Sequence, residues 1–151
     1  MNTSVQQQLN LPPMDQVGFV YKDLDAAIAQ YGPMFGPFEV QEYGSFDYTY
    51  RGRSEPAELR IAFGKSGDIE IELIQWVSGH SPHREFIEAG NEGMHHLRFL
   101  VDNVDAMVEQ AAAFGWHCIW YNQFAPGLAM AYMEREGDPL LIEFFENQQA
   151  T

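Results

Sequence analysis

The chain has few basic residues, a single cysteine and no long apolar run. Only 8 Lys and Arg stand against 22 Asp and Glu, which gives a formal net charge of -14 at pH 7. A field of that sign repels phosphate backbones and anionic lipid, so it argues against nucleic-acid and membrane-surface partners. The shortage of cations also weakens the case for a polyanionic substrate.

The cysteine count and the apolar pattern bear on location. A lone cysteine, Cys118, excludes an internal disulfide and fits a reducing compartment. No stretch approaches the roughly 18 apolar residues that a membrane-spanning helix needs. Residues 1–13 have neither a basic start nor an apolar stretch, so we expect a flexible N-terminal arm rather than a signal peptide. A cytoplasmic location is the default expectation.

Two stretches 80 residues apart repeat each other. Residues 16–21 and 96–101 both read as a strand that begins with a polar residue, Gln16 in one and His96 in the other. Each strand leads into a helix, for which Asp23 and Asn103 are good N-caps. Internal repeats of this kind indicate an architecture of related halves.

Further signals repeat in the same order. Residues 65–68 and 135–138 both read as hairpin turns, and the strand after each turn carries a glutamate, Glu72 and Glu143. Each half therefore reads strand, helix, strand, strand, strand.

Proline and glycine suggest several boundaries. Gly32-Pro33 is expected to end the first helix, and residues 44–56 are expected to form a loop. Ser81-Pro82 predicts the start of a helical connector, within residues 80–92, between the two halves.

Four polar side chains occupy corresponding places in the two halves. Alternation along a strand turns them away from the apolar side that each helix is expected to cover. A single strand glutamate usually faces solvent, but the repeat makes a shared site plausible. An amide oxygen, two carboxylates and an imidazole suit Zn²⁺, Ni²⁺, Mn²⁺ or Fe²⁺. The four residues are Gln16, Glu72, His96 and Glu143.

Glu143 is the most informative of the four. Leu141 and Phe145 share its side of the strand, and a carboxylate among apolar neighbours is costly unless it is paired, hydrogen-bonded or bound to a cation. Glu72 has similar neighbours.

At these residues the chain resembles the vicinal oxygen chelate superfamily, which includes glyoxalase I, methylmalonyl-CoA epimerase, extradiol dioxygenases and bleomycin-resistance proteins. The resemblance covers residues 14–147. It implies an α+β fold in which tandem βαβββ modules, residues 14–78 and 94–147, form a curved mixed sheet around a central cavity. The connector and the Gly93-Met94-His95-His96 segment look most like the epimerase branch.

The resemblance also implies a ligand set for a divalent metal ion, Zn or Ni ahead of Co, Mn or Fe. By position the ligands fall on Gln16, Glu72, His96 and Glu143, with His96 preferred to His95 because it matches Gln16. The epimerase branch has His at the first position. Gln, Glu, His and Glu are instead the set of zinc-type glyoxalase I.

The implied function is a metal-dependent lyase or isomerase that transfers a proton, through a metal-stabilised enolate or enediolate, on a small carbonyl substrate. Glu143, or else Glu72, would act as the base. Arg98 faces the same side as His96 and would either hold a substrate carboxylate or pair with Glu70 or Glu72. Aromatic and apolar residues are candidates for the pocket: Trp76, Phe46, Tyr48, Tyr50, Trp120, Met130, Tyr132 and Phe145.

Two alternatives stay open. One is an acyl-CoA epimerase, which the connector favours and the charge disfavours. The other is a non-catalytic protein that binds a small molecule such as a drug. A homodimer is also expected, although the sequence leaves open whether modules pair within one chain or between two.

Overall fold

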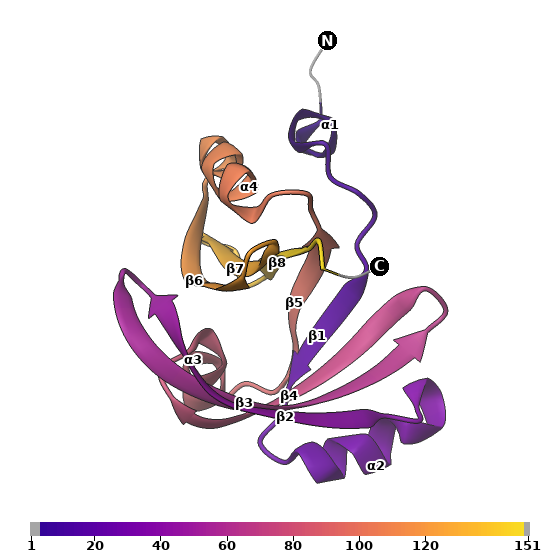
Figure 1. Cartoon of the computed structure of the whole chain (residues 1–151). Coiled ribbons are helices and arrows are strands. Elements are labelled where there is room, and N and C mark those ends of the chain that lie inside the picture. The colour runs from indigo at the N-terminus through magenta and orange to yellow at the C-terminus, as the bar shows by residue number, and fades with distance from the viewer. Residues whose placement is uncertain (1–3, 150–151) are drawn as a thin grey trace.

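Two βαβββ modules follow each other along the chain in the computed structural model, which describes residues 4–149 (Figure 1). The first contains β1 (Gln16–Val20), α2 (Leu24–Phe35), β2 (Glu39–Tyr50), β3 (Arg53–Ser66) and β4 (Ile69–Gly79). The second contains β5 (Gly93–Leu100), α4 (Val104–Ala111), the 3-10 turn η1 (Ala112–Phe114), β6 (Trp116–Ala125), β7 (Leu128–Arg135) and β8 (Leu141–Asn147). Helix α3 (Pro82–Glu88) connects them. The predicted α+β class and its repeat are confirmed.

The repeated helix starts have the same physical basis in both modules. The Asp23 carboxylate accepts a hydrogen bond from the backbone N–H of Ala26 at 3.0 Å, and the Asn103 side chain accepts one from Ala106 at 2.9 Å. Each cap satisfies a backbone donor that has no partner inside the helix. The connector helix begins in the same manner, because Ser81 caps it and Pro82 occupies its first turn.

The strands form a closed barrel in the order β1-β4-β3-β2-β6-β7-β8-β5. Strand β1 runs parallel to β4 and antiparallel to β5, and β5 runs parallel to β8. The barrel closes through a short contact between β2 and β6, where Thr49 pairs with Tyr121 and Tyr50 with Trp120. The two modules therefore pair within one chain.

Each module is covered by its own helix on the outer side of the sheet (Figure 1). Leu24 and Ala27 of α2 pack on Ile71 and Leu73 of β4, while Val104 and its neighbours on α4 pack on β7 and β8. A third cluster lies inside the barrel, between the modules. Alternation along the strands thus separates the helix-covered faces from an inner face, as predicted.

The first module has longer elements than expected. Helix α2 continues through Gly32-Pro33 to Phe35, because a proline in the last turn removes only one hydrogen bond and the N–H of Gly36 still bonds to the carbonyl of Gly32 at 2.9 Å. The predicted loop at residues 44–56 is wrong. It is the tip of the β2–β3 hairpin, which turns at Arg51 and Gly52, both with positive φ.

The N-terminal arm contains a short helix. Ser4 and Gln7 form a reciprocal capping box that begins helix α1 (Val5–Leu9). Leu9 is buried against the α4 side of the molecule. Residues 1–3 of the arm lie outside the described part of the chain.

No helix within residues 4–149 is long and apolar enough to cross a membrane.

Candidate metal centre

Two adjacent rows of paired residues cross the inner face of the barrel. In one row Glu72 of β4 pairs with Gly18 of β1, which in turn pairs with His96 of β5. In the next row Arg98 of β5 pairs with Glu143 of β8. A Cβ atom on Gly18 would overlap the His96 ring, so the missing side chain leaves the space that the imidazole occupies. The rows bring His96 between the two glutamates.

The spacing of these three side chains suits a metal ion. One ligand atom from each of Glu72, His96 and Glu143 lies within 4.8 Å of the others. The His96 Nε2 atom is 3.3 Å from Glu72 Oε1 and 3.2 Å from Glu143 Oε1. Ligand atoms bound at about 2.0–2.2 Å around one ion are themselves separated by about 3.0–3.5 Å. The observed separations therefore fit one shared cation.

Hydrogen bonding points to the same site. Among residues 4–149, the buried side-chain atoms without a hydrogen-bond partner are Gln16 Oε1, Glu72 Oε1, His96 Nε2 and Trp120 Nε1. The carboxylate oxygens of Glu72 and Glu143 lie within ion-pair distance of Nε2. Each unpaired buried polar atom costs about 1–3 kcal/mol. Three of the four belong to predicted ligands, and one cation between Glu72 and His96 would satisfy the atoms of those two residues.

The surroundings of His96 act on its pKa in opposite directions. Burial lowers it, while the carboxylates of Glu143 and Glu72 raise it, and together they bring the pKa of His96 to about 9. The site thus strongly favours positive charge between the two glutamates.

A second histidine sets the hydrogen position on His96. His95 is buried, with its Nδ1 atom 3.0 Å from Nδ1 of His96. Burial, together with the neighbouring His96, lowers the pKa of His95 well below 6.5, so this ring is neutral and carries one hydrogen. The His95 ring donates this hydrogen to the backbone of Pro82, because proline has a carbonyl acceptor but no N–H donor. His95 therefore accepts from His96 Nδ1–H, and the Nε2 atom of His96 faces the glutamates.

Gln16 is fully buried in the row next to His96. Its amide nitrogen donates to Glu70 Oε1 at 2.7 Å, which leaves Oε1 as the atom without a partner. The amide is therefore oriented with its oxygen available as a ligand.

Arg98 binds the carboxylate of Asp15 and lies close to that of Glu70, the hydrogen-bond partner of Gln16. Its guanidinium forms two hydrogen bonds with Asp15, at 3.1 and 2.7 Å, and lies 3.6 Å from Glu70. Of the alternatives expected for Arg98, the contact with Glu70 is present, whereas Asp15 is a partner that the sequence did not reveal. A guanidinium bound in this bidentate manner is largely committed to its partner.

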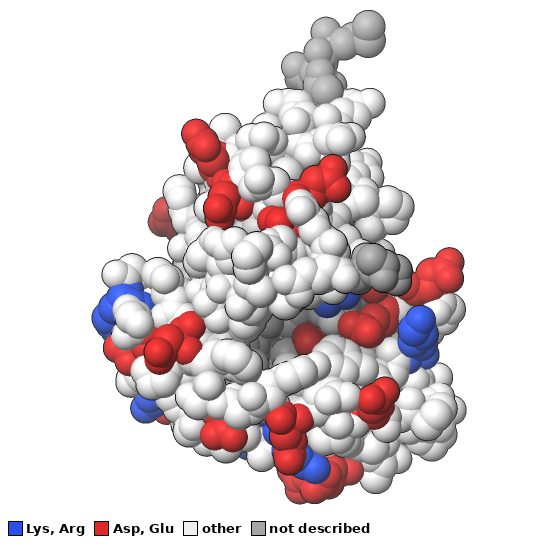
Figure 2. Space-filling model, in the orientation of Figure 1, with Lys and Arg blue, Asp and Glu red and all other residues white. Residues whose placement is uncertain are grey.

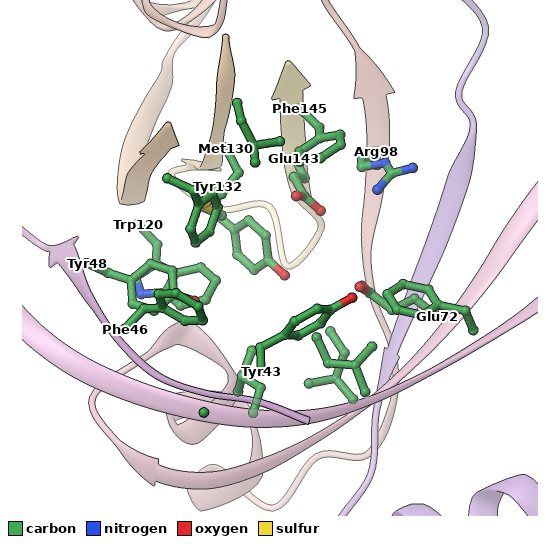
Figure 3. Close-up of a pocket in the computed structure, with 17 residues that line it drawn as sticks. Tyr43, Phe46, Tyr48, Glu72, Arg98, Trp120, Met130, Tyr132, Glu143 and Phe145 are labelled. Atoms are coloured by element: carbon green, nitrogen blue, oxygen red, sulfur yellow. The ribbon is translucent and has the colours of Figure 1, made fainter. Parts of the chain in front are cut away.

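A cavity of about 390 Å³ lies beside the cluster, and both glutamates line it (Figure 3). Of the residues expected to bind substrate, Arg98, Met130 and Tyr132 line the cavity. Trp76 does not, which corrects the prediction: its indole N–H donates to the carbonyl of Gly79 at 3.1 Å, and its ring contacts Arg84. The cavity residues are Tyr43, Gly44, Phe46, Tyr48, Leu59, Ile61, Phe63, Glu72, Ile74, Arg98, Trp120, Phe124, Leu128, Met130, Tyr132, Glu143 and Phe145.

Comparison with known families decides the relationship. Residues 15–132 match the profile of the Glyoxalase/Bleomycin resistance protein/Dioxygenase superfamily. The chain belongs to this superfamily. The predicted resemblance to the vicinal oxygen chelate proteins is thereby confirmed.

Individual relatives are distant. The uncharacterised protein YqjC of Bacillus subtilis (strain 168) is 28% identical over 104 residues, which are 66% of this chain and 73% of that protein. The structure of the hypothetical protein BH1468 from Bacillus halodurans C-125 is 23% identical with a TM-score of 0.64, covering 91% of this chain and 96% of that one. Methylmalonyl-CoA epimerase from Mycobacterium tuberculosis is 20% identical with a TM-score of 0.63, covering 97% and 92%. These structural likenesses support the superfamily fold.

In this member of the superfamily a further histidine stands behind the cavity. His83 of α3 is fully buried, with Nε2 3.0 Å from the hydroxyl of Tyr132 and Nδ1 3.2 Å from Ser81 Oγ. Burial, followed by the charges of Glu143 and Glu72, raises the pKa of Tyr132 well above 10, so it remains a neutral phenol. Sequence reasoning missed His83, because a histidine in a short connector helix carries no signal of burial.

Proposed function

We propose that this protein is a metal-dependent enzyme that moves a proton on a small carbonyl compound, as a lyase or isomerase. The observation that carries the proposal is the cluster of Glu72, His96 and Glu143, whose ligand atoms lie within 4.8 Å of one another. With the buried Gln16 Oε1, which has no hydrogen-bond partner, they would form the donor set of a divalent ion, with Zn²⁺ or Ni²⁺ ahead of Co²⁺, Mn²⁺ or Fe²⁺. Such an ion supplies Lewis-acid stabilisation of negative charge on a substrate oxygen.

The two glutamates provide the groups that move the proton. Glu143 and Glu72 both line the cavity and come from opposite modules. Glu143, or else Glu72, takes a proton from the carbon next to the carbonyl, and the electron pair of the broken C–H bond passes to the carbonyl oxygen. Return of the proton to the same or the neighbouring carbon completes an epimerisation or an isomerisation.

The comparisons support the proposal at the level of the superfamily. Some structural neighbours are named methylmalonyl-CoA epimerases, but at 20% identity they bear on the fold alone. An acyl-CoA epimerase is therefore a second candidate. A non-catalytic binding protein is a third, and the apolar cavity would suit it equally well.

Metal content tests the first step. Protein purified without added metal is expected to bind one divalent ion per chain, and its melting temperature should rise on addition of Zn²⁺, Ni²⁺ or Co²⁺. The double variant Glu72→Gln/Glu143→Gln should bind none, while Glu88→Gln, at an exposed helix position, should behave as the wild type. A wild type that lacks metal and shows an unchanged melting temperature with all three ions would contradict the proposal.

Proton transfer is tested separately. Metal-loaded protein in D₂O is expected to introduce deuterium into the carbon next to the carbonyl of hydroxyacetone or 2-hydroxyacetophenone, as followed by proton NMR. Exchange with methylmalonyl-CoA alone would favour the epimerase. Bound metal without exchange into any of these compounds would favour the binding protein.

The proposal extends to a cytoplasmic homodimer, but the site does not require a partner. Glu72, His96 and Glu143 meet within one chain. Metal affinity should therefore stay constant as the protein is diluted and any dimer dissociates, which light scattering can follow.

A further inference from the structure

We infer that the cavity selects an uncharged carbonyl compound that carries an aromatic or similarly flat apolar group, and that it does not select a coenzyme A thioester. The carbonyl part rests on the proposed function. The preference for an uncharged ring rests on different residues and stands without it.

The ring preference comes from the end of the cavity remote from Glu72. In Figure 3, Phe46, Tyr48 and Trp120 gather on the opposite side of the cavity from that glutamate. Tyr48 stacks on Trp120 with ring centroids 4.0 Å apart, and Phe124 meets Phe46 edge-on at 5.5 Å. Such a group of rings offers both faces and edges to another ring.

We call Phe46, Tyr48, Trp120 and Phe124 the aromatic wall. Two of its four side chains are only partly covered by the rest of the protein. Phe46 and Phe124 keep 39% and 38% of their surface exposed, although both line the cavity. Exposed aromatic surface inside a concave site favours an apolar ligand, because covering it removes that surface from water.

The exclusion of phosphate-bearing ligands follows from the cations. Within the described residues, Arg98 is the only basic residue that lines the cavity, and Asp15 already holds it in a bidentate pair. The other five arginines, all within residues 4–149, also have carboxylate partners: Arg51 with Glu85 and Glu134, Arg53 with Glu55, Arg60 with Asp25 and Glu42, Arg84 with Glu88, and Arg135 with Asp138. The two lysines, Lys22 and Lys65, do not line the cavity. A phosphate inside the cavity would therefore have to displace Asp15 from Arg98.

Charge balance inside the cavity points the same way. The charges of Glu72 and Glu143 together equal that of one divalent ion, and Asp15 offsets Arg98. A negative group on the ligand would therefore have no uncommitted cation to pair with, which is costly in a site of this burial. Figure 2 shows acidic side chains around the hollow between the modules, beside few basic ones.

Size limits the ligand further. A volume of about 390 Å³ lies near the lower end of the range for small-molecule sites. It has room for a carbonyl group with one ring, whereas the nucleotide part of coenzyme A would have to lie outside on an acidic surface.

Calorimetric titration with three probes tests the inference. 2-Hydroxyacetophenone and hydroxyacetone share an α-hydroxyketone group and differ in the ring, while acetyl-CoA supplies the phosphates. We expect 2-hydroxyacetophenone to bind at least about tenfold more tightly than hydroxyacetone, and acetyl-CoA to bind more weakly than either. Equal affinity for the two ketones, or tighter binding of acetyl-CoA, would overturn the inference.

Variants locate the binding. Phe124→Ala and Phe46→Ala should each weaken 2-hydroxyacetophenone about tenfold, while leaving hydroxyacetone and the metal affinity unchanged. Val77→Ala removes apolar surface that is exposed outside the cavity and is the control. If Phe124→Ala lowers the melting temperature, the smaller change Phe124→Leu replaces it in the binding measurement. Ring-dependent binding by protein that holds no metal would refute the proposed enzyme and keep this inference, whereas metal binding without ring preference would do the reverse.

Discussion

Gly18 lies directly across the sheet from His96, and the imidazole ring occupies the volume that a side chain at position 18 would fill. The same glycine pairs on its other side with Glu72. A residue without a side chain between two functional ones is therefore what lets His96 reach toward the glutamate. Glycine inside a strand often marks such a close approach.

Gly18→Ala should abolish tight metal binding. The added methyl group displaces the His96 ring, so we expect the metal dissociation constant to rise about 100-fold or more. Overpacking should also lower the free energy of unfolding by about 1–3 kcal/mol. Gly32→Ala is the control, because a Cβ atom there meets nothing within 4 Å. Unchanged metal affinity in Gly18→Ala would show that His96 is not a ligand.

His95→Leu tests the hydrogen position on His96. Without the acceptor at 3.0 Å from His96 Nδ1, the ring loses its tautomer preference and its orientation. We expect metal affinity to fall about 10–100-fold. Nitrogen NMR of the metal-free protein at high pH should show Nδ1–H on His96 in the wild type and a tautomer mixture in the variant. His117→Gln, at an exposed position, controls for loss of a histidine. A tautomer that stays the same would contradict the arrangement.

Gln16→Leu removes the buried amide oxygen and keeps a similar volume. The variant also loses the Nε2 hydrogen bond to Glu70, so the free energy of unfolding should fall by about 1.5–3 kcal/mol, and the metal should bind about tenfold more weakly. Titration of zinc against a competing chelator measures this. Gln110→Leu, at an exposed helix position, is the control. Equal zinc affinity in wild type and Gln16→Leu would limit the site to three protein ligands.

His83 should make the metal-free protein less stable in acid. Burial, with smaller effects from His95 and His96, lowers the pKa of His83 well below 6.5 in the fold, whereas the unfolded chain retains a pKa near 6.5. Below pH 6.5 the His83 side chain binds a proton in the unfolded state but stays neutral in the folded state. The contribution of His83 to the free energy of unfolding is therefore complete above pH 6.5 and is lost as the pH falls below it. Its partners, Tyr132 and Ser81, carry no negative charge that would offset the proton.

Urea unfolding with a chelator, at pH 7.5 and 5.5, measures the effect. The contribution of His83 to the loss of stability should be about 1.4 kcal/mol between those values. His83→Gln should show a pH dependence smaller by that amount, and His80→Gln, at an exposed position, should match the wild type. An identical pH dependence in His83→Gln would mean that His83 takes up its proton inside the fold.

Much of the site could be predicted because its signals repeat. The equivalent positions of Gln16 and His96, and of Glu72 and Glu143, defined two modules. Alternation then turned these side chains inward, where the structure brings Glu72, His96 and Glu143 together. The outer part of the β2–β3 hairpin, residues 44–56, was read as a loop, because a β-bulge at residues 43 and 44 interrupts the alternation that identifies a strand.

The sequence by itself determined the repeat, the caps and the facing of each strand residue, since these depend on neighbours a few positions apart. Tertiary structure decided the rest: that Asp15 holds Arg98, that His95 orients His96, and that Gly18 makes room for the ring. The Asp15–Arg98 and Gly18–His96 pairs depend on the register between strands, which brings together residues up to 83 positions apart, and His95 depends on Pro82 of α3 for its hydrogen-bond partner. No local pattern records such distances, so only the closed barrel reveals them.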